Sequence, residues 1–198
     1  MDNTVLLLAL LNFALIIATP RIFFRRDGSF NARWWSASAP HGLCPLFLVA
    51  ARVFHLAPVV PQRWLEVTGL VAVVFLAGAV ALLTLTMGTH RIPLSLWHQT
   101  NDAPREIVTW GPYRWVRHPF YCSYLLTYLG TLALFPHWVT IAMLLYMAVI
   151  LNDLAGREER KLSASAFGAE YLQYMARTRR FLPIGARRPA SAVKQAST

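Results

Sequence analysis

Long apolar runs alternate with short polar segments along this chain, a pattern typical of helices that cross a membrane. A transmembrane helix needs about 20 mostly apolar residues, with a workable range of about 17 to 25. The last two runs are separated by Pro136 and His137 alone, which predicts a tight helical hairpin. We therefore expect an all-α, polytopic membrane protein with about five transmembrane helices. The five runs are Thr4–Thr19, Leu43–Val60, Trp64–Met87, Tyr121–Phe135 and Trp138–Leu154.

Composition supports the membrane interpretation. Of the 198 residues, 56% are hydrophobic and only 14% are charged, and the mean hydropathy is +0.42. An ordinary soluble domain carries about 25% charged residues, so this chain has too little charge to cover a surface that faces water. Only Asp2 precedes the first run, whereas a signal peptide carries positive charge there. The first run is therefore expected to be a retained anchor.

The distribution of basic residues predicts the orientation. The net charge is +10, and every Lys and Arg except Arg52 and Arg63 falls in segments 20–42, 88–120 and 155–198. Basic residues collect in cytoplasmic loops, so these segments are expected inside and the N-terminus outside. Because the basic residues form no single stripe, we expect no nucleic-acid partner. The charge bias and the lack of a disulfide framework suit a bacterial inner membrane with a cytoplasmic active site and C-terminus.

We divide the chain into three parts. Residues 1–87 hold three transmembrane helices, 88–184 form the functional core with a long cytoplasmic loop, and 185–198 form a disordered basic tail. Within the core, Arg157–Arg180 has the pattern of an amphipathic helix that lies on the membrane surface or covers a cytoplasmic site. Its expected inward residues are Leu162, Phe167, Tyr171 and Tyr174.

Several single residues have competing interpretations. Arg52 and His55 lie three residues apart, on one helix face, which points into the bundle or a wet cavity, unless Arg52 extends to the membrane surface. Cys44 and Cys122 are read as small buried hydrophobic residues. The tryptophans mostly flank the predicted spans, as in an interfacial belt. No histidine pair has a metal-ligand spacing with a third partner, so we expect no metal.

The polar segment Gly88–Tyr121 joins two predicted spans and is much longer than an ordinary helix connection. Pro119 suits the first turn of a helix, because a proline there loses no hydrogen bond within the helix. Arg117 and His118 then lie at the N-terminus of that helix, where backbone N–H groups attract anionic or electron-rich groups. This geometry predicts a ligand site.

The predicted hairpin brings Glu158 and Glu159 back beside His118. Carboxylates near a cationic, aromatic cleft suit a ligand with a positive centre and hydroxyl groups. The alternative is that the glutamates belong to a solvated helix start, where acidic residues are favoured. Both interpretations are open at this level.

Three sequence elements resemble a known family. The stretches IVTWGPYRWVRHPFY, EERKLSASAFGAEYLQY and RFLP together resemble the isoprenylcysteine carboxyl methyltransferase (ICMT) family and its bacterial membrane relatives. The resemblance covers about residues 88–184. It implies an integral membrane methyltransferase that uses S-adenosylmethionine without a Rossmann domain, which agrees with the absence of a G-x-G-x-x-G motif after a strand.

The resemblance also implies roles for particular residues. Glu159 matches the glutamate that contacts the cofactor, with Glu158 as its neighbour, although the spacing to Phe167 leaves open which of the two is the counterpart. Tyr171, Tyr174 and Arg177 match a closing C-terminal helix. The segment that runs along the cofactor corresponds to Arg105, Glu106, Ile107 and Val108, and the core of the cofactor pocket to Tyr113, His118, Pro119, Phe120 and Tyr121.

The expected activity is methyl transfer from S-adenosylmethionine to a lipophilic or lipidated acceptor, such as a prenylcysteine-type carboxylate. Ala155, or Leu154 with one insertion, occupies the place of the family arginine that meets such a carboxylate. O- or N-methylation of a phenolic lipid, a quinone-like ring or a phospholipid amine is the alternative, and a non-catalytic membrane carrier or assembly factor is the rival of another class. His118 and Glu158 are the candidate bases, and Arg52 is a candidate acceptor contact.

Overall fold

The computed structural model describes residues 1–18, 29–89 and 107–183 of the chain. Helices dominate these ranges, and the described residues contain one isolated β-bridge and no strand. The predicted all-α class is therefore confirmed. The helices are α1 (Asn3–Ala18), α2 (Ala32–Val53), α3 (Leu65–Thr89), α4 (Pro119–Leu134), α5 (Trp138–Ser163) and α6 (Gly168–Arg177), with short 3₁₀ helices η1 (Gln62–Trp64) and η2 (Gly111–Arg114).

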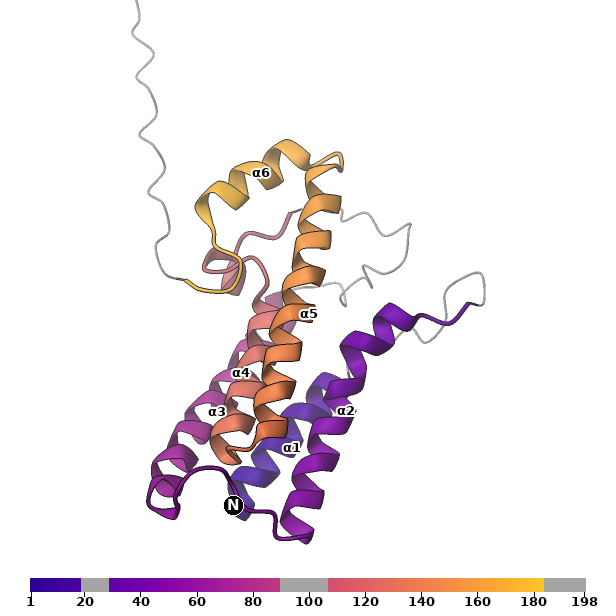
Figure 1. Cartoon of the computed structure of the whole chain (residues 1–198). Coiled ribbons are helices and arrows are strands. Elements are labelled where there is room, and N and C mark those ends of the chain that lie inside the picture. Colours follow the sequence, from indigo (N-terminus) through magenta and orange to yellow (C-terminus); the bar gives the residue numbers. More distant parts are fainter. Residues whose placement is uncertain (19–28, 90–106, 184–198) are drawn as a thin grey trace, which may run out of the picture.

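Helices α1 to α5 run along one another in an elongated bundle, and α6 lies across one end of it (Figure 1). Helix α4 packs most extensively against α3. Gly130 of α4 makes this close approach possible, because a Cβ atom there would lie 2.7 Å from Leu76 Cγ. The bundle therefore depends on a helix crossing that leaves no room for a side chain.

The predicted hairpin between α4 and α5 is present. Pro119 occupies the first turn of α4. The side chain of His137 accepts a hydrogen bond from the backbone N–H of Val139, and Thr140 Oγ1 accepts one from the His137 N–H, which together cap α5. Such reciprocal capping satisfies N–H groups that a helix start leaves without partners. The chain reverses within a few residues and brings the start of α4 beside the last turns of α5.

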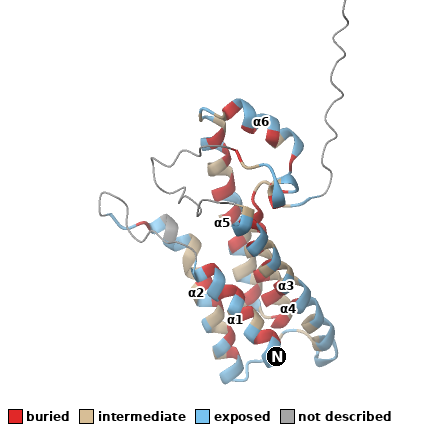
Figure 2. Ribbon diagram, turned by 180° about the vertical axis from the view of Figure 1, so that it is seen from behind, coloured by how far each residue is buried: buried red, intermediate tan, exposed pale blue. Residues whose placement is uncertain are grey.

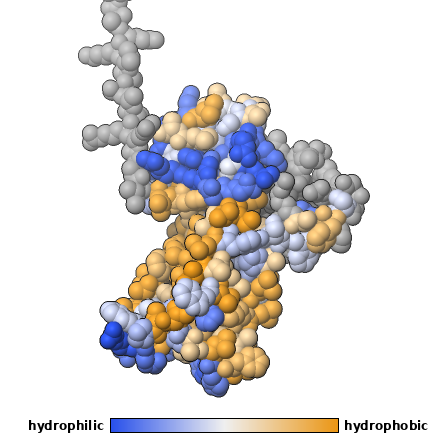
Figure 3. All heavy atoms as spheres, viewed as in Figure 1, coloured by the Kyte–Doolittle hydropathy of each residue, from blue (hydrophilic) through white to orange (hydrophobic). Residues whose placement is uncertain are grey.

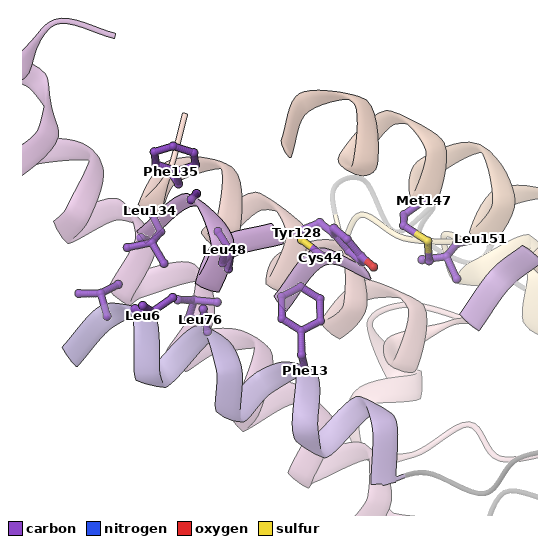
Figure 4. Close-up of a cluster of buried hydrophobic side chains, with 14 of the residues drawn as sticks. Leu6, Phe13, Cys44, Leu48, Leu76, Tyr128, Leu134, Phe135, Met147 and Leu151 are labelled. Carbon is purple, nitrogen blue, oxygen red and sulfur yellow. The ribbon is translucent and has the colours of Figure 1, made fainter. Parts of the chain in front are cut away.

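The core lies between the five long helices (Figure 4). Two polar contacts cross it: Thr127 donates to Asn12 Oδ1 at 3.2 Å, and the Tyr128 hydroxyl is 3.1 Å from His41 Nδ1. These hydrogen bonds connect α1 and α2 to α4 inside an apolar environment. Both cysteines are free and buried, as expected. The main core side chains are Leu6, Phe13, Cys44, Leu48, Leu76, Tyr128, Leu134, Phe135, Met147 and Leu151.

The outside of the bundle is apolar. Red, buried residues face inward in Figure 2, whereas Figure 3 shows a mainly orange, hydrophobic outer surface below a blue, hydrophilic band near α6. Exposed apolar faces of this extent mark membrane or partner contact. Two helical stretches of the described residues, Gln62–Thr89 and Trp138–Ser163, are long and apolar enough to cross a membrane, and α1 is a shorter apolar helix. The number of five spans stays a prediction.

The second predicted run differs from the observed helix. We expected Leu43–Val60, but α2 extends from Ala32 to Val53 and contains two prolines. Its C-terminal end lies ten residues after Leu43, so His55 lies beyond the helix, at a backbone φ of 53°. The predicted shared face of Arg52 and His55 is therefore wrong.

The predicted amphipathic helix Arg157–Arg180 is two helices. Helix α5 continues past the apolar run to Ser163, the chain turns, and α6 begins at Gly168. A Cβ atom at Gly168 would lie 2.3 Å from the Ser163 carbonyl oxygen, so this turn requires glycine. The inward residues are nevertheless correct: three are buried and Phe167 is partly buried against them. The predicted disordered tail lies outside the described residues.

Candidate functional site

The candidate site lies where α4 begins and α5 ends, beneath α6 (Figure 1). His118 precedes α4 and reaches both glutamates of α5: its Nε2 is 3.2 Å from Glu159 Oε1 and its Nδ1 is 3.4 Å from Glu158 Oε2. The hydroxyl of Tyr121 donates to Glu158 Oε1, and the Tyr121 ring stacks on His118 with centroids 5.4 Å apart. The two glutamates lie in the last turns of α5 rather than at a solvated helix start.

Glu159 is the centre of an ion cluster. Its side chain is 5% exposed, and its Oε1 accepts from Arg117 Nε at 3.0 Å, Arg117 Nη2 at 2.9 Å and Arg180 Nε at 3.0 Å. Arg180 Nη2 donates to Oε2. A buried carboxylate is tolerated only when it is paired and hydrogen-bonded. Because both oxygens already accept from arginines, Glu159 holds the surrounding cations in place.

Arg180 reaches the site because the chain after α6 returns to the start of α4. Val116 and Arg179 form a parallel β-bridge. The backbone N–H of Arg117 donates to the Arg179 carbonyl at 2.8 Å, and that of His118 donates to the Arg180 carbonyl at 3.2 Å. The Arg117 side chain also donates to the Thr178 carbonyl. Backbone hydrogen bonds thus join the segment before α4 to the segment after α6.

Charge in the cluster shifts two pKa values in opposite directions. Burial raises the pKa of Glu159, but hydrogen bonds from His118, Arg180 and Arg117 lower it by more, so the net pKa lies well below its usual range. Burial lowers the pKa of His118, but hydrogen bonds and charges of Glu158 and Glu159 raise it by more, so the net pKa is above 6.5. The cluster therefore favours an ionised glutamate and a protonated histidine.

Helix α6 covers the segment that precedes η2. The Tyr174 hydroxyl donates to the Tyr113 carbonyl at 2.6 Å. Ile107, Leu162, Tyr171 and Tyr174 form a small buried cluster against which Tyr113 packs. This cluster places residues 107 and 113 beside α6. Pro119 and Phe120 are buried at the start of α4, while Arg105 and Glu106 lie outside the described residues.

An open pocket of about 370 Å³ lies against the last turns of α5. Its volume is within the range of about 300 to 1,000 Å³ that is usual for small-molecule sites. Helix α5 contributes one face, and the end of α6 with the following segment contributes the other. The lining residues are Gly156, Glu159, Arg160, Ser163, Ala164, Met175 and Arg180.

The structure does not bring Arg52 to this site. Arg52 is exposed at the C-terminal end of α2 and donates to Asn3 Oδ1 at 3.2 Å, at the end of the bundle opposite α6 (Figure 1). Within the ranges 1–18, 29–89 and 107–183, there is no group of three His, Cys, Asp or Glu side chains arranged to hold a metal ion. The site therefore consists of the residues around His118.

Sequence reasoning placed Arg117 beside His118 at a predicted ligand site but did not pair it with Glu159, and it missed Arg180 as a site residue. Both stand in motifs that carried the family resemblance, since Arg117 begins RHP and Arg180 begins RFLP. A search for cations able to compensate a buried glutamate would have considered them.

Comparison with known proteins agrees with the resemblance. No curated protein and no solved structure matches the chain. A family model described as "Isoprenylcysteine carboxyl methyltransferase (ICMT) family" matches residues 70–164. This region contains α4, α5, His118 and both glutamates of the site, and the family is one of membrane methyltransferases. Residues 70–164 of the chain are therefore similar to the ICMT family.

Proposed function

We propose that this protein is an integral membrane methyltransferase that moves a methyl group from S-adenosylmethionine to a lipophilic acceptor. One observation carries the proposal: His118, Tyr121 and the two glutamates form one polar group directly above an apolar bundle (Figure 3). A site at this boundary is accessible to a water-soluble cofactor from one side and to a lipid-soluble acceptor from the other. We place it on the cytoplasmic side, in a bacterial inner membrane.

The residues present suit S-adenosylmethionine, which carries an ammonium group, a sulfonium group and ribose hydroxyls. Glu158 is the better direct contact, because its side chain is 20% exposed and contacts His118 and the Tyr121 hydroxyl, whereas Glu159 accepts from two arginines. Sequence reasoning assigned that contact to Glu159, which we now propose as an anchor for Arg117 and Arg180. Tyr113 and the backbone of Ile107 and Val108 complete the proposed binding set. When bound, the cofactor supplies an electrophilic methyl group.

The protein's contribution would be alignment of the acceptor and exclusion of water. Alignment alone can account for about 7 to 11 kcal/mol of a reaction barrier. Because positive charge disappears as the methyl group is transferred, a free carboxylate at the reacting centre would stabilise the ground state more than the transition state. Hydrogen bonds from His118 and Tyr121 moderate the charge of Glu158 and so limit this effect.

His118 is the proposed proton acceptor for acceptors that lose a proton. A carboxylate acceptor needs no base, whereas a phenol or an amine does. His118 can accept a proton only in its neutral form, and the two carboxylates beside it then stabilise the protonated product. Glu158 is the second candidate for this role.

The remaining alternatives for the function differ in the chemical class of the methyl acceptor. A prenylcysteine-type carboxylate would need a nearby cation, and because Ala155 at the matched position is buried and neutral, Arg157 or Arg160 of the same helix would have to supply it. A phenolic lipid, a quinone-like ring or a phospholipid amine is the second candidate substrate class, because such acceptors need no cation. A transfer assay with labelled cofactor against a lipid extract, followed by mass identification of the product, distinguishes these classes.

Calorimetry on the purified protein in detergent tests cofactor binding. We expect S-adenosylmethionine and its demethylated product to bind, and His118→Ala, Glu158→Gln and Glu159→Ala to abolish binding. The matched control is Glu170→Gln, because Glu170 is an exposed residue of α6. Thermal unfolding confirms that each variant is folded. Absence of binding in the parent protein would favour a membrane carrier or assembly factor, and unchanged binding in all variants would refute the site assignment.

A further inference from the structure

The pocket beside α5 contains more positive than negative charge. Two arginines, Arg160 and Arg180, and one glutamate, Glu159, line it. Glu159 also forms an ion pair with Arg117, so its negative charge is already compensated within the cluster described above. Among the described residues, the guanidinium of Arg160 has no hydrogen-bond or ion-pair partner, and its side chain is exposed. The pocket therefore has an uncompensated cation at its rim.

The two guanidinium groups converge over a glycine. A Cβ atom at Gly156 would lie 3.5 Å from Arg160 Nη1 and 3.8 Å from Arg180 Nη2. Arg180 is fixed in this position, because its Nη1 donates to Asn152 Oδ1 at 2.6 Å and its Nε and Nη2 both donate to Glu159. Like charges directed at the same point repel one another, and an anion bound between them would remove the repulsion. Guanidinium pairs are well suited to phosphate oxygens.

The surface below the pocket indicates what kind of anion fits. Leu145 and Val149 lie on the same face of α5 as Gly156, since positions 7 and 11 residues apart nearly superimpose around a helix. They are 61% and 69% exposed, and they precede Gly156 by about 10 to 17 Å along the helix axis. An exposed apolar stripe thus lies on the same helix face, about two turns before the basic pocket. This arrangement matches an amphiphile with acyl chains on the stripe and an anionic head group at the arginines.

We propose that Arg160, Arg180 and Gly156 form a binding site for the phosphate head group of an anionic membrane lipid. The site lies at the end of the apolar part of α5, where head groups of a bilayer are expected if this helix crosses the membrane. Ser163, whose hydroxyl has only the sulfur of Met175 as a partner at 3.8 Å, is available to donate a further hydrogen bond. A bound lipid would tie the end of α6 and Arg180 to the membrane surface.

Native mass spectrometry of the full-length protein in detergent tests this proposal, with phosphatidylglycerol and phosphatidylcholine titrated separately. We expect phosphatidylglycerol to bind at least about tenfold more tightly, about 1.4 kcal/mol, because the choline cation of phosphatidylcholine compensates the charge of its phosphate. Arg160→Gln and Gly156→Ala should reduce binding to the phosphatidylcholine level. Alanine favours a helix more than glycine does, so Gly156→Ala narrows the pocket without risk to folding.

Arg157→Gln is the matched control. Arg157 lies in the same turn of α5 and pairs with Asp153 at 2.7 Å, so its loss removes the same charge from a residue that does not line the pocket. Phosphatidylglycerol binding should survive this substitution. Equal losses in Arg157→Gln and Arg160→Gln would show a general charge effect and overturn the proposal, as would equal binding of the two lipids.

Two further measurements separate the lipid site from other occupants. Inorganic phosphate should neither bind measurably at millimolar concentration nor displace phosphatidylglycerol, and displacement would assign the site to free phosphate. Calorimetry with S-adenosylmethionine should give unchanged affinity in Arg160→Gln and Gly156→Ala. Loss of cofactor binding in these variants, with lipid binding retained, would assign the pocket to the cofactor. The lipid-binding measurement does not depend on whether the proposed methyl transfer occurs.

Discussion

At the scale of single residues, the balance of charge around Glu159 governs the site. Arg117, Arg180 and His118 all donate to this carboxylate. The sequence predicted that Glu159 would meet His118, because a hairpin must return the chain to its starting level. Arg180 could not be predicted in the same way, since a backbone pairing between segments about 60 residues apart positions it.

Loss of the Glu159 charge should destabilise the protein by about 3 kcal/mol, because a buried ion cluster that loses one partner leaves uncompensated charges. Thermal unfolding in detergent of Glu159→Gln measures this effect. Asp153→Asn removes an exposed carboxylate that also pairs with an arginine and should cost less than about 0.5 kcal/mol. Similar midpoints for the two variants would show that Glu159 is not part of a buried cluster.

The same cluster predicts the shape of the pH dependence. The pKa of Glu159 is lowered from 4.5, so its contribution is present above about pH 4.5 and is lost as the pH falls through the folded-state pKa. The pKa of His118 is raised from 6.5, so its contribution is present below about pH 6.5 and is lost as the pH rises through the folded-state pKa. The unfolding midpoint of the parent protein should therefore be highest between about pH 4.5 and pH 6.5. In Glu159→Gln, the midpoint should depend less on pH below about pH 4.5.

At the scale of elements, apolar runs predicted four of the five long helices, whereas the bounds of α2 and the turn before α6 were not predicted. For α2, the expected start at Leu43 was wrong because the helix continues through Pro40 and Pro45, although proline usually interrupts a helix. The predicted helix Arg157–Arg180 is interrupted between Ser163 and Gly168 by a turn that requires glycine, although its amphipathic pattern is uninterrupted. Periodicity reports which face is buried, but not where the chain turns.

Close packing of α3 on α4 gives a test at this scale. Gly130→Ala would place a Cβ atom 3.2 Å from the backbone nitrogen of Leu76 and still closer to its side chain, so the helices must separate. We expect a loss of about 1 to 3 kcal/mol, measured by thermal unfolding in detergent. Gly78→Ala in α3 is the control, because nothing lies within 4 Å of its Cβ position. A neutral Gly130→Ala would contradict the observed packing.

At the scale of the whole molecule, the described helices form a bundle with a mainly apolar surface and a polar end near α6 (Figure 3). The charge pattern predicted this asymmetry and, with five spans, opposite locations for the two ends of the bundle. The position of α6 across one end was suggested only by the resemblance, because hydrophobicity alone cannot distinguish a helix on a membrane surface from one that covers a site. Tertiary contacts with residues 107 and 113 decide between them.

Membrane topology can be tested with single introduced cysteines. Cys44 and Cys122 are buried, so a membrane-impermeant maleimide should leave the parent protein unlabelled. Gln62, in η1, and Gln173, in α6, are exposed at opposite ends of the bundle. We expect Gln62→Cys to be labelled in intact cells and Gln173→Cys only after permeabilisation. Labelling of both positions from outside would contradict the predicted orientation.

The β-bridge between Val116 and Arg179 has a consequence for biosynthesis. Arg179 and Arg180 follow all five long helices in the chain, so they are synthesised after them. The bundle can therefore enter the bilayer while Glu159 still lacks one of its guanidinium partners. Assembly of the proposed site is thus a late event, and a nascent chain that is stalled before Arg179 should be unable to complete the ion cluster around Glu159.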